Sequence, residues 1–271
     1  MIKLEKTEVV GWEAAIRGMR NPMNSWDKSD SRYSCLCMDD KRDCPVEPYI
    51  IGPNDHELMI KLRNAGTDHR KFMRMIVVYL DITAPLYWWK EFDTYKVGTV
   101  ANSCSTMHKI HEKEFALDDF SHGHLIADEE RPIYSAFNDE RLDGGGLLGL
   151  TINFLNYWRN KYLKAKTKPM KEESKRAELM KQYWWQMIQM LPSSYNQKRT
   201  VMLSYEVLAN IYKSRKNHKL DEWVEFCKWI EGLPYSELIT GASLKDIPIC
   251  NEIMEEAKRR VTEEEDLNNE C

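Results

Sequence analysis

The sequence has no long hydrophobic run that would place it in a membrane or mark it for export. Its opening segment, MIKLEKTEVVGWEAA, contains no uninterrupted apolar stretch of signal-peptide length. An uncharged stretch at 144–158 is too short, and too rich in Gly and Asn, to cross a bilayer. We therefore expect neither a secreted protein nor a membrane protein.

A strong excess of charge of one sign is also missing. The 39 Lys and Arg residues against 43 Asp and Glu residues leave a net charge of −4. This balance argues against a nucleic-acid-binding protein that works by broad neutralisation of phosphates, so we expect no nucleic-acid partner. The seven cysteines are an odd, scattered set, which favours reduced thiols and a cytoplasmic location.

What is present is an ordinary globular composition in 271 residues, with 42% hydrophobic and 30% charged side chains. Two stretches predict strands, 3–10 and 72–82; in the second, every even position from Ile76 to Ile82 is apolar. Helical patterns fall at 13–19, 54–66, 86–96, 148–163, 171–190, 197–214, 220–231 and 247–262. The sequence therefore predicts an α+β fold, a single mostly helical domain over 1–271 with a small sheet and irregular loops at 21–53 and 111–146.

Two of these helices carry specific expectations. Asn54, with Glu57 three residues later, predicts an N-cap for the helix that Gly66 ends. The helix at 197–214 is predicted from an apolar stripe at helical spacing, formed by Val201, Tyr205, Leu208 and Tyr212.

Histidine and cysteine clusters raise the question of a metal. Imidazole and thiolate groups suit zinc or iron, but loop histidines exposed to solvent and structural thiols are the favoured interpretations. The residues concerned are His108, His111, His122 and His124, together with Cys35, Cys37 and Cys44.

Residues 81–109, DITAPLYWWKEFDTYKVGTVANSCSTMHK, form a third cluster. A strand and a helix lead into a turn rich in Thr, Asn, Ser and Lys, which would gather hydrogen-bond donors for a phosphate or a heterocycle. An ordinary capped helix end would look similar.

The order of features around this cluster resembles the flavin-dependent thymidylate synthases. The stretch DHELMIKLRNAGTDHRKFMRMIVVYLDITAPLYWWKEFDTYK places His69 in a turn, a strand at 72–82, the Ala84–Pro85 step and then a helix. A second stretch, NQKRTVMLSYEVLANIYKSRKNHKLDEWVEF, is similar to another region of the family, in which an Arg begins a helix and an Asn precedes the next one. Arg199 and Asn217 stand at those positions.

The resemblance implies a homotetramer that binds FAD and dUMP at subunit interfaces. The reaction would methylate dUMP, or a related pyrimidine nucleotide, with methylenetetrahydrofolate as carbon donor and NADPH as reductant of the flavin. By position, the implied cofactor-binding residues are His69, Lys96, Asn102 and Asn217, and the implied substrate-binding residues are Ser103, Ser105 and Arg199. No catalytic residue is assigned.

Departures from the family pattern keep other functions open. Thr94-Tyr95-Lys96 stands where the family has Arg-His-Arg, and Thr106 or Met107 replaces the Arg that closes the motif. A further family Arg is replaced by Cys227 or Ile230, which leaves Arg199 as the phosphate-binding candidate. The alternatives are a catalytically inactive nucleotide- or flavin-binding relative and a metal protein. Arg199, near a predicted helix start, would need a ligand or an acidic partner, and Asn217 could cap the helix at 220–231.

Overall fold

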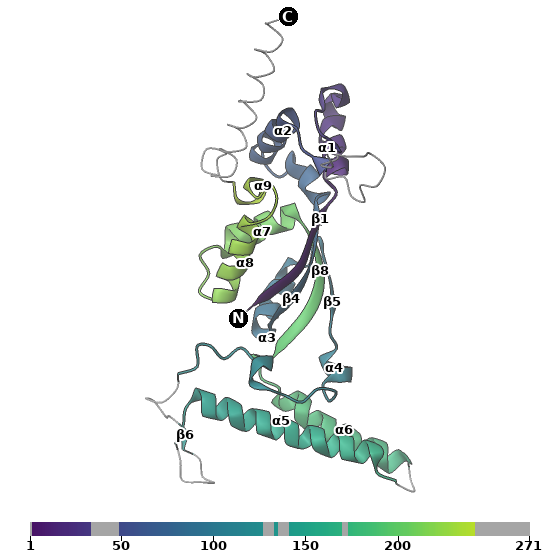
Figure 1. The fold of residues 1–271 in the computed structure, drawn as a ribbon, viewed down its shortest axis with the longest axis vertical. Helices are drawn as coiled ribbons and strands as arrows, with labels where there is room; N and C mark the ends of the chain where they lie inside the picture. Colours follow the sequence, from purple (N-terminus) through teal and green to yellow (C-terminus); the bar gives the residue numbers. More distant parts are fainter. Residues whose placement is uncertain (1, 34–48, 127–132, 135–140, 170–172, 242–271) are drawn as a thin grey trace, which may run out of the picture. The chain divides into compact units, whose positions relative to one another are not determined.

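A computed structural model describes residues 2–33, 49–126, 133–134, 141–169 and 173–241 of the chain. These residues form two compact units. Figure 1 shows their helices and strands, coloured along the sequence. The first unit comprises Met1–Thr7, Tyr79–Lys96 and Val100–Val201, and the second comprises Glu8–Val78, Val97–Thr99 and the described part of Met202–Cys271. A single domain over 1–271 stays a prediction, whereas the mostly helical α+β class is confirmed.

Four strands form a sheet in the order β1-β4-β8-β5. Their bounds are β1 Lys3–Val10, β4 Val77–Pro85, β5 Thr99–Ser103 and β8 Asn196–Ser204. The predicted alternation is confirmed in β4, where Val78, Leu80 and Ile82 are buried while Tyr79 is exposed. This strand begins later than predicted, because residues Arg70–Arg74 form the 3₁₀ helix η3.

The prediction of one helix over 197–214 is wrong. The stretch forms β8 and then the helix α7, Tyr205–Arg215. Val201 and Leu203 are both buried, a period of two that a strand between β4 and β5 requires. The helix begins only after Ser204, whose hydroxyl accepts a hydrogen bond from the Val207 amide.

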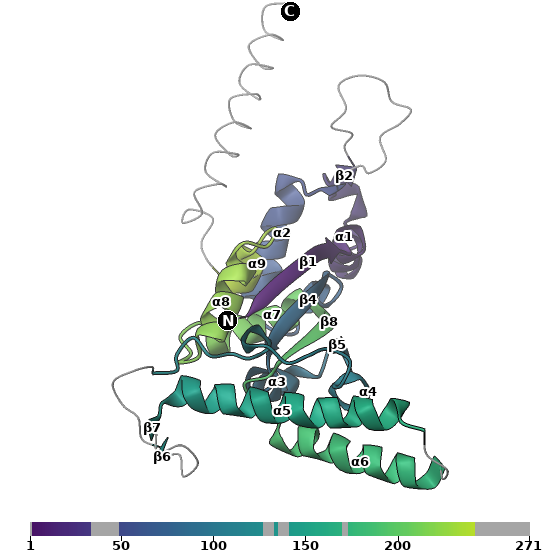
Figure 2. The same ribbon diagram turned by 60° about the horizontal axis from the view of Figure 1, so that its bottom comes forward.

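In the first unit, two long helices lie side by side as a hairpin (Figure 2). They are α5, Gly144–Thr167, and α6, Glu173–Met190, close to their predicted ranges. Leu148, Leu155 and Met187 from these helices pack with Ile110, Phe115 and Phe120 in one core. No helix among the described residues has the length and apolarity needed to cross a membrane.

The remaining elements of the first unit are short. They are α3 Leu86–Phe92, the 3₁₀ helix η4 Asp93–Tyr95, α4 Thr106–Lys109, the 3₁₀ helix η5 Leu117–Asp119, and the strands β6 Ile133–Tyr134 and β7 Arg141–Leu142. The predicted helix at 86–96 is therefore an α-helix followed by a 3₁₀ turn. The backbone amides of Leu86 and Tyr87 donate to the carbonyls of Tyr195 and Ser193, which joins the start of α3 to the chain entering β8.

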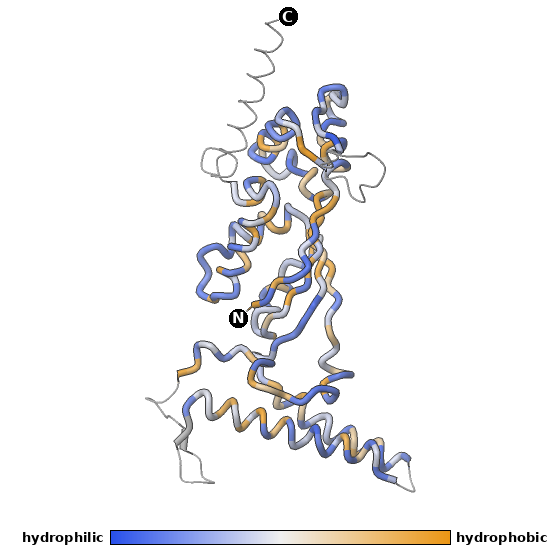
Figure 3. Tube along the Cα trace, viewed as in Figure 1, coloured by the Kyte–Doolittle hydropathy of each residue, from blue (hydrophilic) through white to orange (hydrophobic). Residues whose placement is uncertain are grey.

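The second unit is mainly helical. Its elements are α1 Trp12–Arg20, η1 Asn21–Met23, η2 Trp26–Lys28, β2 Arg32–Tyr33, β3 Tyr49–Ile50, α2 Pro53–Asn64, η3, α7, α8 Asp221–Glu231 and α9 Glu237–Thr240. Helix α7 packs against α8, α9 and η3. Tyr205, Leu208, Trp223 and Phe226 are buried there, and apolar positions recur along these helices in Figure 3.

The predicted N-cap at Asn54 is wrong, and Asn217, for which capping was one alternative, is not a cap either. The N-cap of α2 is Gly52, because the Asp30 side chain accepts hydrogen bonds from the backbone amides of Asn54 and Asp55 and so takes over the capping role. The N-cap of α8 is Leu220, which leaves Asn217 in the turn before it. The predicted helix at 247–262 and Cys35, Cys37 and Cys44 lie outside the described residues.

Candidate functional site

The polar turn after β5 lies against β8 in the first unit. Ser103 ends β5 and Ser105 is the N-cap of α4, and between them the Cys104 amide donates to the Lys198 carbonyl at 2.9 Å. The side-chain amide of Gln197 donates to the Cys104 carbonyl at 3.0 Å. These bonds bring the two predicted serines beside the strand that carries Arg199.

The prediction that Arg199 begins a helix is wrong. The residue lies inside β8. Its Nη1 donates to Asp93 Oδ1 at 2.9 Å, its Nε donates to Gln197 Oε1 at 3.0 Å, and its guanidinium carbon lies 4.1 Å from the centre of the Trp89 ring. Only 15% of its side chain is exposed. The positive charge is thus already neutralised by Asp93, and a phosphate would have to compete with that carboxylate.

The aromatic surface under Arg199 is fixed by the interior. Trp89 is buried, and its indole N–H donates to the Gln197 carbonyl at 2.9 Å. Trp88 is buried as well, with its ring centre 4.9 Å from that of Trp89 and 5.0 Å from that of Phe92. Both tryptophans therefore belong to the core, and Trp89 also stacks on the guanidinium through a cation–π contact.

Three further predicted residues of this region are exposed. Lys96 follows η4, whereas Asn102 and Ser103 lie in β5. All three residues are exposed to solvent. Ser105 has a structural role, because its hydroxyl accepts a hydrogen bond from the His108 amide at 3.0 Å. The exposed Lys96, Asn102 and Ser103 can bind a ligand, whereas Ser105 would first have to release the α4 cap.

A carboxylate on β4 ties the sheet together next to this turn. Asp81 accepts a hydrogen bond from the Thr200 hydroxyl at 2.7 Å and lies 3.0 Å from the Lys198 ammonium. These two contacts hold the pKa of Asp81 below its usual value, with the Thr200 hydrogen bond the larger cause. The strand carrying Arg199 is therefore anchored to β4 on either side of that residue.

His69 lies in the second unit, on the wall of a cavity of about 960 Å³. It is an exposed residue of the turn before η3, and its amide donates to the Gly66 carbonyl. Lys28 and Lys71 supply cations to the same wall, while Leu58 and Phe72 supply apolar surface. Asn217, predicted to bind the same cofactor, is exposed and does not line this cavity.

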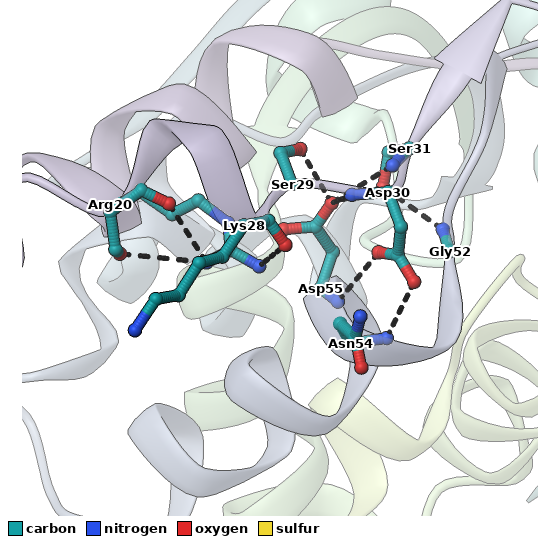
Figure 4. Close-up of polar contacts among 9 residues, drawn as sticks. Arg20, Lys28, Ser29, Asp30, Ser31, Gly52, Asn54 and Asp55 are labelled. Atoms are coloured by element: carbon teal, nitrogen blue, oxygen red, sulfur yellow. Dashed lines mark hydrogen bonds and ion pairs between the residues drawn. The ribbon is translucent and has the colours of Figure 1, made fainter.

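A buried ion pair organises one side of that cavity (Figure 4). Arg20 Nε lies 2.6 Å from Asp55 Oδ1, and the other carboxylate oxygen accepts hydrogen bonds from the hydroxyls of Ser29 and Ser31 at 2.7 and 2.6 Å. Burial alone would raise the pKa of Asp55, but the bonds from Ser31, Ser29 and Arg20 outweigh it and lower the pKa. The pair holds residues 28–31 against the start of α2.

In the described part of the chain, the histidine cluster does not assemble into a metal site. Among the described residues, no three His, Cys, Asp or Glu side chains are grouped as metal ligands would be. His122 Nδ1 lies 2.9 Å from the Phe120 carbonyl, and His111 is buried with its ring centre 4.4 Å from that of Tyr162. His124 and His108 are exposed. The metal hypothesis therefore gains no support from this part of the chain.

Sequence reasoning missed Asp93, Gln197 and Trp89 as the partners of Arg199. Asp93 lies 106 positions before Arg199, so no local pattern connects the two residues. The sequence indicated that Arg199 would need a ligand or an acidic partner, but it did not indicate which residue. Asp93 becomes the partner because residues 196–204 form the strand β8 instead of a helix.

Comparisons with known proteins agree on the fold alone. No family model matches the sequence, and no curated protein matches it. The structure, however, matches the fold of the flavin-dependent thymidylate synthases. Two structures of ThyX from Helicobacter pylori with FAD and dUMP match with TM-scores of 0.53 and 0.54 and sequence identities of 14% and 13%. The matches cover 88% and 89% of this chain and 97% of each ThyX chain, which confirms the predicted resemblance at the level of the fold.

Proposed function

We propose that this chain binds FAD and a pyrimidine nucleotide but does not methylate the nucleotide. The observation that carries the proposal is the fold match over 97% of a ThyX chain whose structure contains FAD and dUMP. The pairing of Arg199 with Asp93 predicts weak binding of the nucleotide phosphate. The absence of arginines from Thr94-Tyr95-Lys96 favours binding without methylation.

The cavity beside His69 fits a flavin dinucleotide in size and chemistry. Its volume of about 960 Å³ lies at the upper end of the range of ligand pockets. FAD, when bound, supplies hydride-transfer chemistry, while the protein positions it. Lys28 and Lys71 would hold the pyrophosphate, and Phe72 and Leu58 would pack against the ring system. The other three predicted cofactor-binding residues do not line this cavity. Lys96 and Asn102 lie in the first unit, and Asn217 lies in the second unit but outside the cavity lining.

The nucleotide would bind at the polar turn of the first unit. Lys96 offers a cation there, and Asn102 and Ser103 offer an amide and a hydroxyl to a pyrimidine ring or a sugar. Lys96 is a point charge and cannot form the two parallel hydrogen bonds of a guanidinium. The turn therefore has donors enough for binding but lacks the fixed bidentate cations that would stabilise charge on a reacting uracil.

Methylation of dUMP with methylenetetrahydrofolate, FAD and NADPH is the second candidate function. The extent of the fold match favours it, since nearly the whole ThyX chain is covered. It would require Arg199 to exchange Asp93 for the substrate phosphate.

The proposal includes a cytoplasmic homotetramer. Leu147, Leu150, Phe154 and Tyr157 lie at helical spacing along α5, and each of these side chains is exposed. Such an apolar stripe is typical of a surface that a second copy covers. The cytoplasmic location rests on the odd, scattered set of seven cysteines in the sequence.

A visible absorption spectrum tests the proposal. Purified protein is incubated with FAD, freed of excess cofactor by gel filtration and scanned, with a Lys71→Glu variant as a matched control. We expect flavin bands that travel with the native protein and are reduced in the variant, and no dUMP-dependent oxidation of NADPH. A flat spectrum would contradict the proposal, while dUMP-dependent NADPH oxidation would establish the second candidate.

A further inference from the structure

A second hollow lies on the helical hairpin of the first unit, between α4, α5 and α6, and we refer to it as the arm groove. Its volume is about 480 Å³, within the range of small-molecule pockets. Tyr162, Met180 and Trp184 form its apolar walls, and His108, Arg176 and Lys181 stand around them. None of these residues belongs to the FAD or nucleotide sites proposed above.

The aromatic walls of the arm groove are held in place from behind. The indole N–H of Trp184 donates to the Met107 carbonyl at 2.7 Å, which fixes the orientation of its ring. The Tyr162 ring lies against the buried His111 ring, with 4.4 Å between their centres. Both aromatic residues also pack against the core of the hairpin. The groove is therefore formed before any ligand binds, which lowers the entropy cost of binding.

The electrostatic surroundings of the groove are positive, in a chain whose net charge is −4. Arg176 and Lys181 contribute cations, and the lining carboxylate, Glu173, already forms an ion pair with Arg176. Behind the Tyr162 wall, burial lowers the pKa of His111.

These features define the chemistry of a ligand. The two aromatic side chains in the lining suit a planar aromatic body, which they can contact face to face or edge to face. The ammonium of Lys181 suits an anionic group at one end of that body, whereas the guanidinium of Arg176 is already paired with Glu173. Neutral aromatic molecules would leave the cations unused, and cationic ones would be repelled.

We propose that the arm groove binds a small molecule that combines a planar aromatic ring with an anionic substituent. The ring contacts Tyr162 and Trp184, and the anion is bound by Lys181. This site is independent of the proposed FAD and nucleotide binding.

The test uses the fluorescent probe 8-anilinonaphthalene-1-sulfonate with the full chain. Lys181→Glu is compared with Lys161→Glu, because both lysines are exposed on the hairpin but Lys161 does not line the groove. Trp184→Phe is compared in the same way with Trp185→Phe, a neighbouring exposed tryptophan outside the lining. We expect Kd for the probe to rise about tenfold in Lys181→Glu, as loss of a charge-assisted contact predicts. Trp184→Phe should raise Kd several-fold, and both controls should stay within about twofold of the native value.

A neutral analogue, N-phenyl-1-naphthylamine, tests the need for the anion and should bind at least about tenfold more weakly than the sulfonate. Equal Kd values for Lys181→Glu and Lys161→Glu would overturn the proposal, and so would equal binding of the two probes. Displacement of the probe by dUMP would also overturn it, since the groove would then be the nucleotide site. If Trp184→Phe fails to fold, the pair of lysine variants decides the question, because both changes are at the surface.

Discussion

Each unit of the molecule contains an arginine–aspartate pair, and the two pairs differ in what surrounds them. Arg20 and Asp55 are 5% and 0% exposed, and Ser29 and Ser31 complete the hydrogen bonding of the carboxylate. Arg199 is 15% exposed, but its partner Asp93 is 40% exposed. The Arg20–Asp55 pair is buried on both sides, whereas in the Arg199–Asp93 pair the aspartate is open to water.

This difference separates two effects of the same kind of ion pair. Breaking a buried pair leaves a charge without solvent or partner, and the cost falls on stability. A pair with one partner open to water contributes less stability, because water can replace that partner. We infer that Arg20–Asp55 holds the cavity wall in place, while Arg199–Asp93 determines which anions the polar turn accepts.

The largest effect is expected from Asp55→Ala. Removing the carboxylate leaves the buried Arg20 guanidinium and two serine hydroxyls without their acceptor, at a cost of about 3–5 kcal/mol in the free energy of unfolding. Urea denaturation followed by circular dichroism measures this cost. Asp93→Ala is the matched control and should lose at most about 1 kcal/mol. Equal losses in the two variants would remove the distinction between the pairs.

Acid sensitivity sharpens the same comparison. The pKa of Asp55 is lowered in the folded state, so its contribution to stability is complete above the pKa of an unfolded aspartate, about 3.9. That contribution is lost as the pH falls through the lowered pKa of the folded protein. Between about pH 6 and about pH 3, the unfolding free energy should therefore fall less steeply in Asp55→Asn than in the native protein. Parallel pH profiles would contradict this role of Asp55.

A smaller effect on stability, but a direct effect on binding, is expected from Asp93→Asn. The change removes the carboxylate that neutralises Arg199 while keeping a side chain of similar size. We expect the affinity for dUMP to rise about tenfold, which corresponds to one charge-assisted hydrogen bond. Calorimetric titration measures the affinity, and Asp118→Asn, an exposed residue of the same unit, is the control. An unchanged Kd in Asp93→Asn would show that Arg199 does not face the nucleotide.

The sequence predicted the parts of the fold that depend on local periodicity. The alternation in β4 and the apolar faces of α5, α6 and α8 are visible in short windows, and their positions are confirmed within a few residues. The helix predicted at 197–214 failed because Val201, Tyr205, Leu208 and Tyr212 keep helical spacing across the junction of β8 and α7. A short strand before a helix can imitate the helical period.

The candidate site was less predictable, because its defining contacts are long-range. The position of the polar turn at 102–105 could be expected from its composition, and the structure places it beside β8. The pairing of Arg199 with Asp93, and the capping of α2 by Asp30, each depend on segments that are distant in the sequence. Such partners become visible only when the tertiary structure brings them together.

The most direct test of the account is a calorimetric titration of dUMP into FAD-treated native protein. The account predicts saturable binding of one nucleotide per chain, with no methylated product when methylenetetrahydrofolate and NADPH are added. Absence of dUMP binding would contradict the central claim that this fold retains a nucleotide site, and formation of a methylated product would establish methylation, the second candidate function.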